Sequence, residues 1–213
     1  MQAPVADERP NILLLVADDL GYAGLGVHGS VIQTPNIDEL AAAGRLFSQF
    51  HTAPYCAPTR AMLLSGSNNH VAGMARQHRS VLAGHTVPGY EASLSDRIAP
   101  LPRLLRDAGY HTYTVGKWHL GLTADKSPHA AGFTRSFSLL DGAGTHFDDV
   151  GFFEGGSTFW EDEDFSEYPV GRYSTEVYTD RLIQFIDSNK DDGSVQPMLG
   201  ESMRSHLADG FGP

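Results

Sequence analysis

The sequence predicts an α/β fold, in which helices sandwich a mostly parallel central sheet that is incomplete in this chain. Residues 11–17 (NILLLVA) form a continuous apolar run between polar neighbours, which is typical of a strand buried on both faces. Further along the chain, strand-like patterns alternate with amphipathic helical patterns, and glycine follows several of the helical ones. This alternation is the pattern of a layered α/β domain.

The remaining elements follow from local patterns. Alternating and β-branched residues predict two more strands, over residues 45–52 and 111–116. Proline at a first helical position, apolar residues at helical spacing and a closing glycine predict the helices, over residues 35–43, 58–65, 101–108 and 174–188. The stretches 67–98 and 122–170 are rich in Gly, Ser, His and acidic residues and are expected to be long loops. No apolar strand pattern follows Asn189.

Composition excludes several classes of protein. The 213 residues correspond to one domain or one and a half. With 15 basic and 26 acidic residues the net charge is −11, which argues against binding to the phosphate backbone of a nucleic acid. A single cysteine excludes an internal disulfide framework and a cysteine-based zinc cluster.

No apolar run has the length of a membrane span, and residues 12–17 are too few for the core of a signal peptide. We therefore expect no membrane partner and a cytoplasmic location for the sequence as it stands. A periplasmic or secreted location is expected if a leader has been removed.

Asp18 and Asp19 directly follow the first predicted strand. Ligands of open α/β sheets bind outside the carboxyl ends of the strands, so this pair is expected at the mouth of a site. Two adjacent carboxylates repel each other unless a cation lies between them, and their hard oxygen atoms suit Ca²⁺ or Mg²⁺. The alternative is that one of them caps a following helix.

Cys56 and Arg60 share one short motif, CAPTR, at the start of a predicted helix. Free backbone N–H groups at a helix start favour anions, and Arg60 lies one turn into the helix. The guanidinium group of Arg60 beside the sulfur atom of Cys56 predicts a site for a tetrahedral oxyanion such as sulfate or phosphate. The alternatives are a buried structural cysteine and a thiolate nucleophile with a histidine base.

Lys117 and His119 stand two residues apart at the end of the third predicted strand. On an extended segment both side chains would point to one side, with Trp118 on the other. Together they would supply a charge that holds an oxyanion and a titratable base. The alternative is a surface scatter of polar residues around a packed tryptophan.

Taken together, four segments resemble the N-terminal part of the type I sulfatases, and most closely the bacterial arylsulfatases of the alkaline-phosphatase superfamily. These segments read PNILLLVADDLGY, TPNIDELAAAG, CAPTRAMLLSG and LPRLLRDAGYHTYTVGKWHLG. The likeness runs from about Pro10 to Asn189, and the C-x-P-x-R and G-K-W-H-x-G motifs are highly specific. The resemblance implies a sulfatase-like fold, with residues 1–192 as the N-terminal part of a catalytic domain and residues 193–213 as a divergent tail.

The resemblance also implies a role for each candidate residue. Cys56 matches the cysteine that a formylglycine-generating enzyme converts to Cα-formylglycine, the nucleophile toward sulfur. Asp18 and Asp19 match two ligands of a Ca²⁺ ion (Mg²⁺ being possible) that also binds the formylglycine at position 56. Arg60 matches the arginine that holds the formylglycine in place, and Lys117 matches a lysine that neutralises the hydrated formylglycine and the sulfuryl group. His119 matches the histidine that deprotonates the second hydroxyl, so that sulfate leaves and the aldehyde forms again.

The implied function is the hydrolysis of sulfate esters. The family completes its metal site with an Asp-Asn pair further along the chain, and this dipeptide does not occur in the 213 residues. Two alternatives therefore stand beside an active arylsulfatase. One is a truncated, catalytically incomplete sulfatase, and the other is a phosphate or phosphonate monoester hydrolase of the same superfamily.

Overall fold

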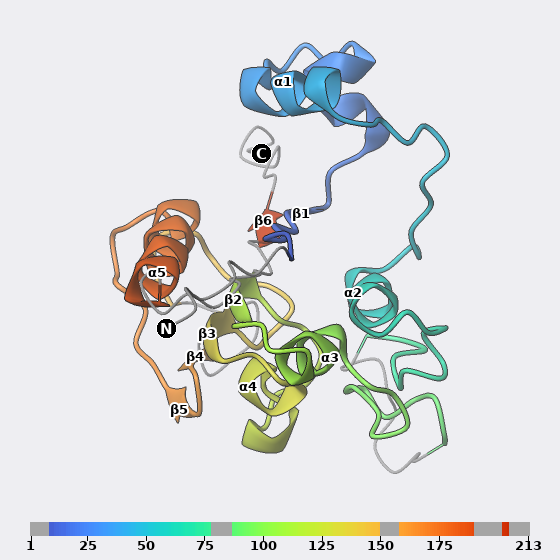
Figure 1. Ribbon diagram of the computed structural model, residues 1–213, viewed down its shortest axis with the longest axis vertical. Helices are drawn as coiled ribbons and strands as arrows, with labels where there is room; N and C mark the ends of the chain where they lie inside the picture. Colours follow the sequence, from blue (N-terminus) through green and yellow to red (C-terminus); the bar gives the residue numbers. More distant parts are fainter. Residues whose placement is uncertain (1–8, 78–86, 150–157, 190–201, 205–213) are drawn as a thin grey trace, which may run out of the picture.

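Two sheets and the helices around them form the part of the chain that a computed structural model describes, namely residues 9–77, 87–149, 158–189 and the backbone of 202–204 (Figure 1). One sheet has the strand order β2-β3-β4-β5, and the other pairs β1 with β6. The strands are β1 Val16–Asp18, β2 Tyr113–Lys117, β3 Arg135–Leu139, β4 Phe159–Glu161, β5 Asp164–Phe165 and β6 Ser202–Arg204. The main helices are α1 Pro35–Ala43, α2 Cys56–Ser65, α3 Leu101–Asp107, α4 Pro128–Ala131 and α5 Ser174–Asn189.

The α/β class is confirmed, and the sheets are mixed rather than mostly parallel. Strand β2 pairs with β3, and β1 with β6, in the parallel sense, whereas β3–β4 and β4–β5 are antiparallel. Strands β3, β4 and β5 lie in the stretch that the sequence analysis assigned to a long loop. Strand β6 lies in the tail, where no apolar strand pattern occurs.

Helix α5 covers one face of the larger sheet. Alternate residues of β2 and β3 point toward it, and the shared core consists of Tyr113, Val115, Phe137, Leu139, Phe159, Tyr168, Val177, Tyr178, Leu182 and Phe185. A second core packs α2 against the segments that follow it and follow β2. It is made of Ala57, Ala61, Leu64, Ala72, Met74, Leu94, Ile98, Trp118, Leu120, Ala131, Phe133 and Leu140. These two cores hold the ends of α2 and β2 in fixed positions.

The predicted strand over residues 45–52 is wrong. This segment has no regular structure, and its apolar side chains are exposed, with Phe47 at 70% and Phe50 at 72%. An alternating pattern forms a strand only where a neighbouring strand accepts its hydrogen bonds, and no strand lies beside this segment in the described part of the chain.

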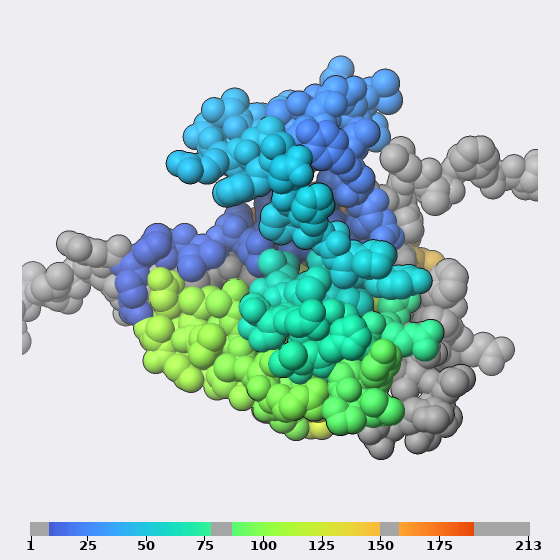
Figure 2. All heavy atoms as spheres, turned by 90° about the vertical axis from the view of Figure 1, so that its right-hand side faces the viewer, coloured from blue at the N-terminus to red at the C-terminus, as the bar shows by residue number. Residues whose placement is uncertain are grey.

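The first strand is also shorter and more exposed than its apolar sequence predicts. Only Val16–Asp18 are extended and paired, and Leu13 and Leu15 are 59% and 50% exposed. Helix α1 begins and ends as predicted, but it buries none of its side chains. Figure 2 shows this N-terminal part projecting from the body of the molecule. None of the described helices has the length and apolar character needed to cross a bilayer.

Candidate active site

The six candidate residues come from three separate elements that meet in space. Asp18 and Asp19 stand at the carboxyl end of β1, Cys56 and Arg60 at the start of α2, and Lys117 and His119 at the carboxyl end of β2. Ion pairs and hydrogen bonds join Asp18, Arg60 and Lys117, and a further contact joins Cys56 to His119. Asp19 lines a hollow together with three of these residues. The sequence analysis predicted this set of residues, and the fold brings the set together.

Cys56 is the first residue of α2, and its Sγ atom lies 3.2 Å from Nδ1 of His119. The helix therefore begins two residues earlier than predicted, and Pro58 is its third residue rather than its first. Position 56 keeps a free backbone N–H at the helix start, where the helix dipole favours negative charge. The cysteine is half-buried and faces a histidine, which distinguishes it from a cysteine packed only among apolar side chains.

His119 has an unusual backbone. Its φ angle is +59°, in the left-handed region that residues other than glycine rarely adopt, and its side chain is buried. The extended segment expected here therefore ends at Lys117, and the chain turns at the histidine. The N–H of His119 donates to the carbonyl oxygen of Leu140, 3.1 Å away. The ring also packs against Gly142, where an added Cβ would stand 2.5 Å from the imidazole.

Asp18 binds two cations. Its Oδ2 atom lies 2.7 Å from Nζ of Lys117, and its Oδ1 atom lies 3.6 Å from a guanidinium nitrogen of Arg60. The three side chains are only 4–10% exposed. Arg60 also donates to the main-chain oxygen of Lys117 at 2.8 Å, which ties α2 to the end of β2. Burial lowers the pKa of Arg60 below its ordinary value, and the neighbouring Asp18 carboxylate opposes this shift.

These contacts exclude two of the alternatives left open by the sequence. Lys117 and His119 are buried partners of Asp18 and Cys56, so a surface scatter around Trp118 is wrong. A helix cap does not explain the aspartates either. The next helical turn, η1 (Tyr22–Gly24), has Gly21 at its N-cap, and no side chain caps it.

Asp19 is exposed and also has a positive φ angle, of 57°. With Asp18, Cys56 and Arg60 it lines a hollow of about 400 Å³ between β1 and α2. Backbone strain at two residues of one site persists only where the surrounding structure fixes them, and such residues cluster at functional sites.

The described residues do not by themselves fit a complete calcium site. No group of three or more His, Cys, Asp or Glu side chains is close enough to hold a metal in this part of the chain. The carboxylate of Asp18 is already engaged by Lys117 and Arg60, which leaves Asp19 as the exposed carboxylate of the pair. Calcium takes six to eight oxygen ligands, more than this pair supplies.

Gln77 is a neighbour of Cys56 that the sequence did not reveal. Its Nε2 atom lies 3.5 Å from Sγ of Cys56 and donates toward it. A lone glutamine 21 residues from Cys56, in a stretch expected to be a loop, carries no pattern that marks it.

Comparisons with known proteins show which family this chain resembles. A family model described as Sulfatase matches residues 10–200. An uncharacterized sulfatase of Schizosaccharomyces pombe is 51% identical over 144 residues, which cover 66% of this chain and 26% of that protein. An arylsulfatase of Klebsiella aerogenes is 36% identical over 185 residues, which cover 84% of this chain and 39% of that protein. The chain thus spans about a quarter to two fifths of the length of these relatives.

Solved structures share the fold. The crystal structure of Ps i-CgsB in complex with a neocarrahexaose matches with a TM-score of 0.77 at 28% identity, covering 96% of this chain and 46% of that one. The PsFucS1 sulfatase from a Pseudoalteromonas species matches with a TM-score of 0.75 at 24% identity, with the same coverage.

Proposed function

This chain belongs to the sulfatase family, and from that premise we propose that it is a sulfuric ester hydrolase of the arylsulfatase type. The observation that carries the proposal is the 3.2 Å contact between Cys56 Sγ and His119 Nδ1, beside the buried group of Arg60, Lys117 and Asp18. A reactive position, a base and two cations around one point are what hydrolysis of an anionic ester needs.

Position 56 is proposed to carry Cα-formylglycine, formed from Cys56 by a formylglycine-generating enzyme. This group, as its hydrate, would supply the hydroxyl that attacks the sulfur of a sulfate ester. The Sγ atom of the unmodified cysteine stands where an oxygen of that group would lie. His119 Nδ1 is within hydrogen-bond distance of this place and would accept a proton from it.

Arg60 and Lys117 would stabilise the negative charge. Two cations face a single engaged carboxylate, so the group formed with Asp18 has a net charge of +1. In a buried setting such a charge attracts an anion more strongly than it would in water. The sulfuryl oxygens of the substrate are its proposed partners.

We further propose that the complete site holds Ca²⁺, with Mg²⁺ as the other candidate. Asp18, Asp19 and the modified residue 56 would supply some of its ligands. The adjacent carboxylates at the mouth of the 400 Å³ hollow support this assignment. The remaining ligands would have to come from outside the residues described here.

Two further candidates remain. One is a truncated, catalytically incomplete sulfatase. The same pair of cations would also suit a phosphate or phosphonate monoester, because both kinds of ester carry tetrahedral oxyanions.

Co-production of the chain with a formylglycine-generating enzyme tests all three. Mass spectrometry of the peptide that contains residue 56 is expected to show the aldehyde, and the purified chain is then given aryl sulfate, aryl phosphate and excess Ca²⁺. Hydrolysis of the sulfate that is lost in Cys56→Ala supports the sulfatase. Faster hydrolysis of the phosphate supports the monoester hydrolase, and an aldehyde without turnover of either ester supports the incomplete enzyme.

A further inference from the structure

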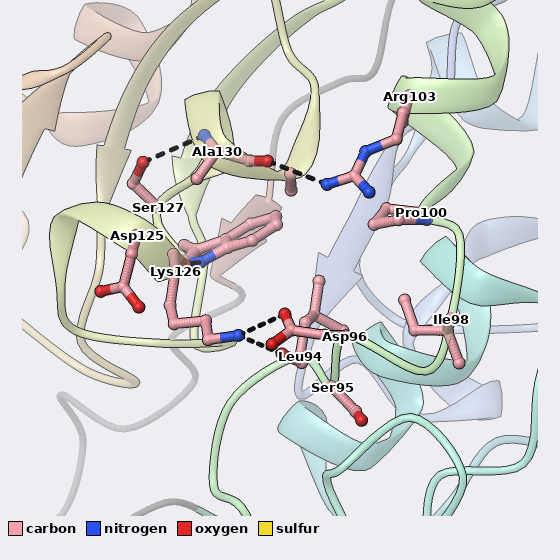
Figure 3. Close-up of a pocket in the computed structure, with 12 residues that line it drawn as sticks. Leu94, Ser95, Asp96, Ile98, Pro100, Arg103, Asp125, Lys126, Ser127 and Ala130 are labelled. Carbon is pink, nitrogen blue, oxygen red and sulfur yellow. Dashed lines mark hydrogen bonds and ion pairs between the residues drawn. The ribbon is translucent and has the colours of Figure 1, made fainter.

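A small hollow of about 80 Å³ is lined by Trp118, which precedes His119, and by Lys126 and the segment 94–96. Figure 3 shows the Lys126 side chain crossing it toward Leu94 and Asp96. The Nζ atom donates to the carbonyl oxygen of Leu94 at 3.2 Å and to Oδ1 of Asp96 at 2.7 Å. The space has room for a few water molecules at most, so the contacts around it are the informative feature.

Both neighbours of His119 are fixed by these same residues. The indole Nε1 of Trp118 donates to the main-chain oxygen of Lys126 at 2.8 Å. The carbonyl oxygen of Leu120 accepts from the N–H of Leu94 at 3.0 Å. Lys126 therefore binds the residue before His119 through its own carbonyl, and the residue after His119 through Leu94.

The backbone of His119 needs such support. A non-glycine residue in the left-handed region is strained, and it stays there only when its surroundings over-determine it. Trp118 is 3% exposed and packs edge-on against Phe133, with ring centroids 6.2 Å apart. The approach of Lys126 is close: a Cβ added at Gly121 would stand 2.4 Å from Cβ of Lys126.

We propose that Lys126 is a positioning residue for His119. Its main-chain oxygen binds Trp118, and its side-chain ammonium binds Leu94. Together these contacts hold the segment 118–120 so that the imidazole faces residue 56. This inference rests on the proposed function for the role of His119 as a base. It adds a residue that forms hydrogen bonds with Trp118, Leu94 and Asp96 rather than with the reacting group.

The bond to Leu94 carries the effect, and the bond to Asp96 does not. The hydrogen bond from Lys126 lowers the pKa of Asp96, but the Asp96 side chain is 96% exposed, where an ion pair contributes little. The ammonium of Lys126 can donate to both acceptors at once. At position 126 an arginine would keep donors for these acceptors, whereas a methionine would keep only the length of the aliphatic chain.

The test uses the unmodified full chain and needs no enzymatic activity. One readout is the ¹⁵N NMR signal of the His119 ring, assigned with His119→Gln. The other is the rate at which iodoacetamide alkylates Cys56. We expect Lys126→Met to shift the ring signal and to change the alkylation rate at least about twofold, as the loss of one net hydrogen bond would. Lys126→Arg should restore both readouts, and Asp96→Asn should leave both unchanged.

Two further variants separate positioning from general stability. Leu182→Ala removes a buried side chain of α5 far from Lys126, so it lowers the melting temperature and should leave the ring signal in place. Lys126→Gln retains one donor and supplies a folded variant if Lys126→Met does not fold. An unchanged ring signal in the folded Lys126 variants, no restoration by arginine, or an equal shift in Leu182→Ala would overturn the proposal. A confirmed shift in a chain that hydrolyses no ester would count against the proposed function alone.

Discussion

The imidazole of His119 packs so closely against Gly142 that no side chain fits at that position. Its Nδ1 atom lies 3.2 Å from the sulfur of Cys56, and a side chain at Gly142 would stand 2.5 Å from the ring. The absence of a side chain at Gly142 therefore leaves the space that the ring occupies. Neither neighbour belongs to the strand that leads to the histidine.

Gly142→Ala should displace the His119 ring and destabilise the fold by about 1–3 kcal/mol, the usual effect of overpacking a filled site. Urea denaturation measures the stability, and the ¹⁵N signal of the ring reports the displacement. The matched control is Gly21→Ala, because nothing lies within 4 Å of the Cβ it would add. Equal stability of the two variants would mean that the ring has room to move.

Asp18→Asn should cost about 3–5 kcal/mol of stability, because it leaves Lys117 and Arg60 buried without their shared anion. Asp19→Asn, at the exposed neighbour, should change the stability by less than about 0.5 kcal/mol. Urea denaturation at neutral pH separates the two variants. If both lose the same amount, the buried ion pairs do not stabilise this region.

The chain should bind Ca²⁺ weakly, with a Kd on the order of 1 mM, because two carboxylates supply only part of the oxygen ligands. Isothermal titration calorimetry of the chain against the Asp18→Ala/Asp19→Ala double variant measures this, and binding should disappear in the double variant. Binding that survives both substitutions would locate the cation away from β1.

Stability should also fall at high pH because of Tyr168. Burial raises its pKa to about 12, and its hydroxyl donates to the main-chain oxygens of His146 and Arg172. The folded state therefore holds this proton more tightly than the unfolded state does. The resulting stability is fully present below the unfolded pKa of about 10 and is lost as the pH rises toward 12.

Chemical denaturation between pH 9 and about 12 tests this linkage. Tyr168→Phe is less stable at pH 9, because it loses both hydrogen bonds, but its stability should depend less on pH over this range. A slope that is the same in both proteins would assign the alkaline loss to other tyrosines or lysines.

The sequence predicted the helices and the site residues better than it predicted the strands. The segment RLFSQFHT (45–52) alternates only loosely and forms no strand, although its pattern predicts one. The segment RSFSL (135–139), within the stretch expected to be a long loop, alternates strictly and forms β3. Its serines look like solvent-facing residues, but Ser136 and Ser138 are at most 1% exposed, and β2 and β4 pair with it on either side. Pairing depends on neighbours that are distant in sequence, which a local pattern does not contain.

The site residues were predictable for the opposite reason. Each pair lies within one short segment, Asp18 with Asp19, Cys56 with Arg60 and Lys117 with His119, so its spacing is visible in the sequence. Gln77 contacts Cys56, and Lys126 contacts Trp118, through hydrogen bonds that only the folded chain creates. The positive φ angles of Asp19 and His119 are likewise absent from any local pattern.

The ion pair between Asp18 and Lys117 joins residues 99 positions apart in the chain. Closing a loop of that length costs about 4 kcal/mol of chain entropy, whereas β2 and β3 come together across a far shorter segment. Folding should therefore start at the pairing of β2 with β3 and reach the site late. Substitutions at Asp18 would then act mainly on the unfolding rate, and substitutions at Phe137 on the folding rate.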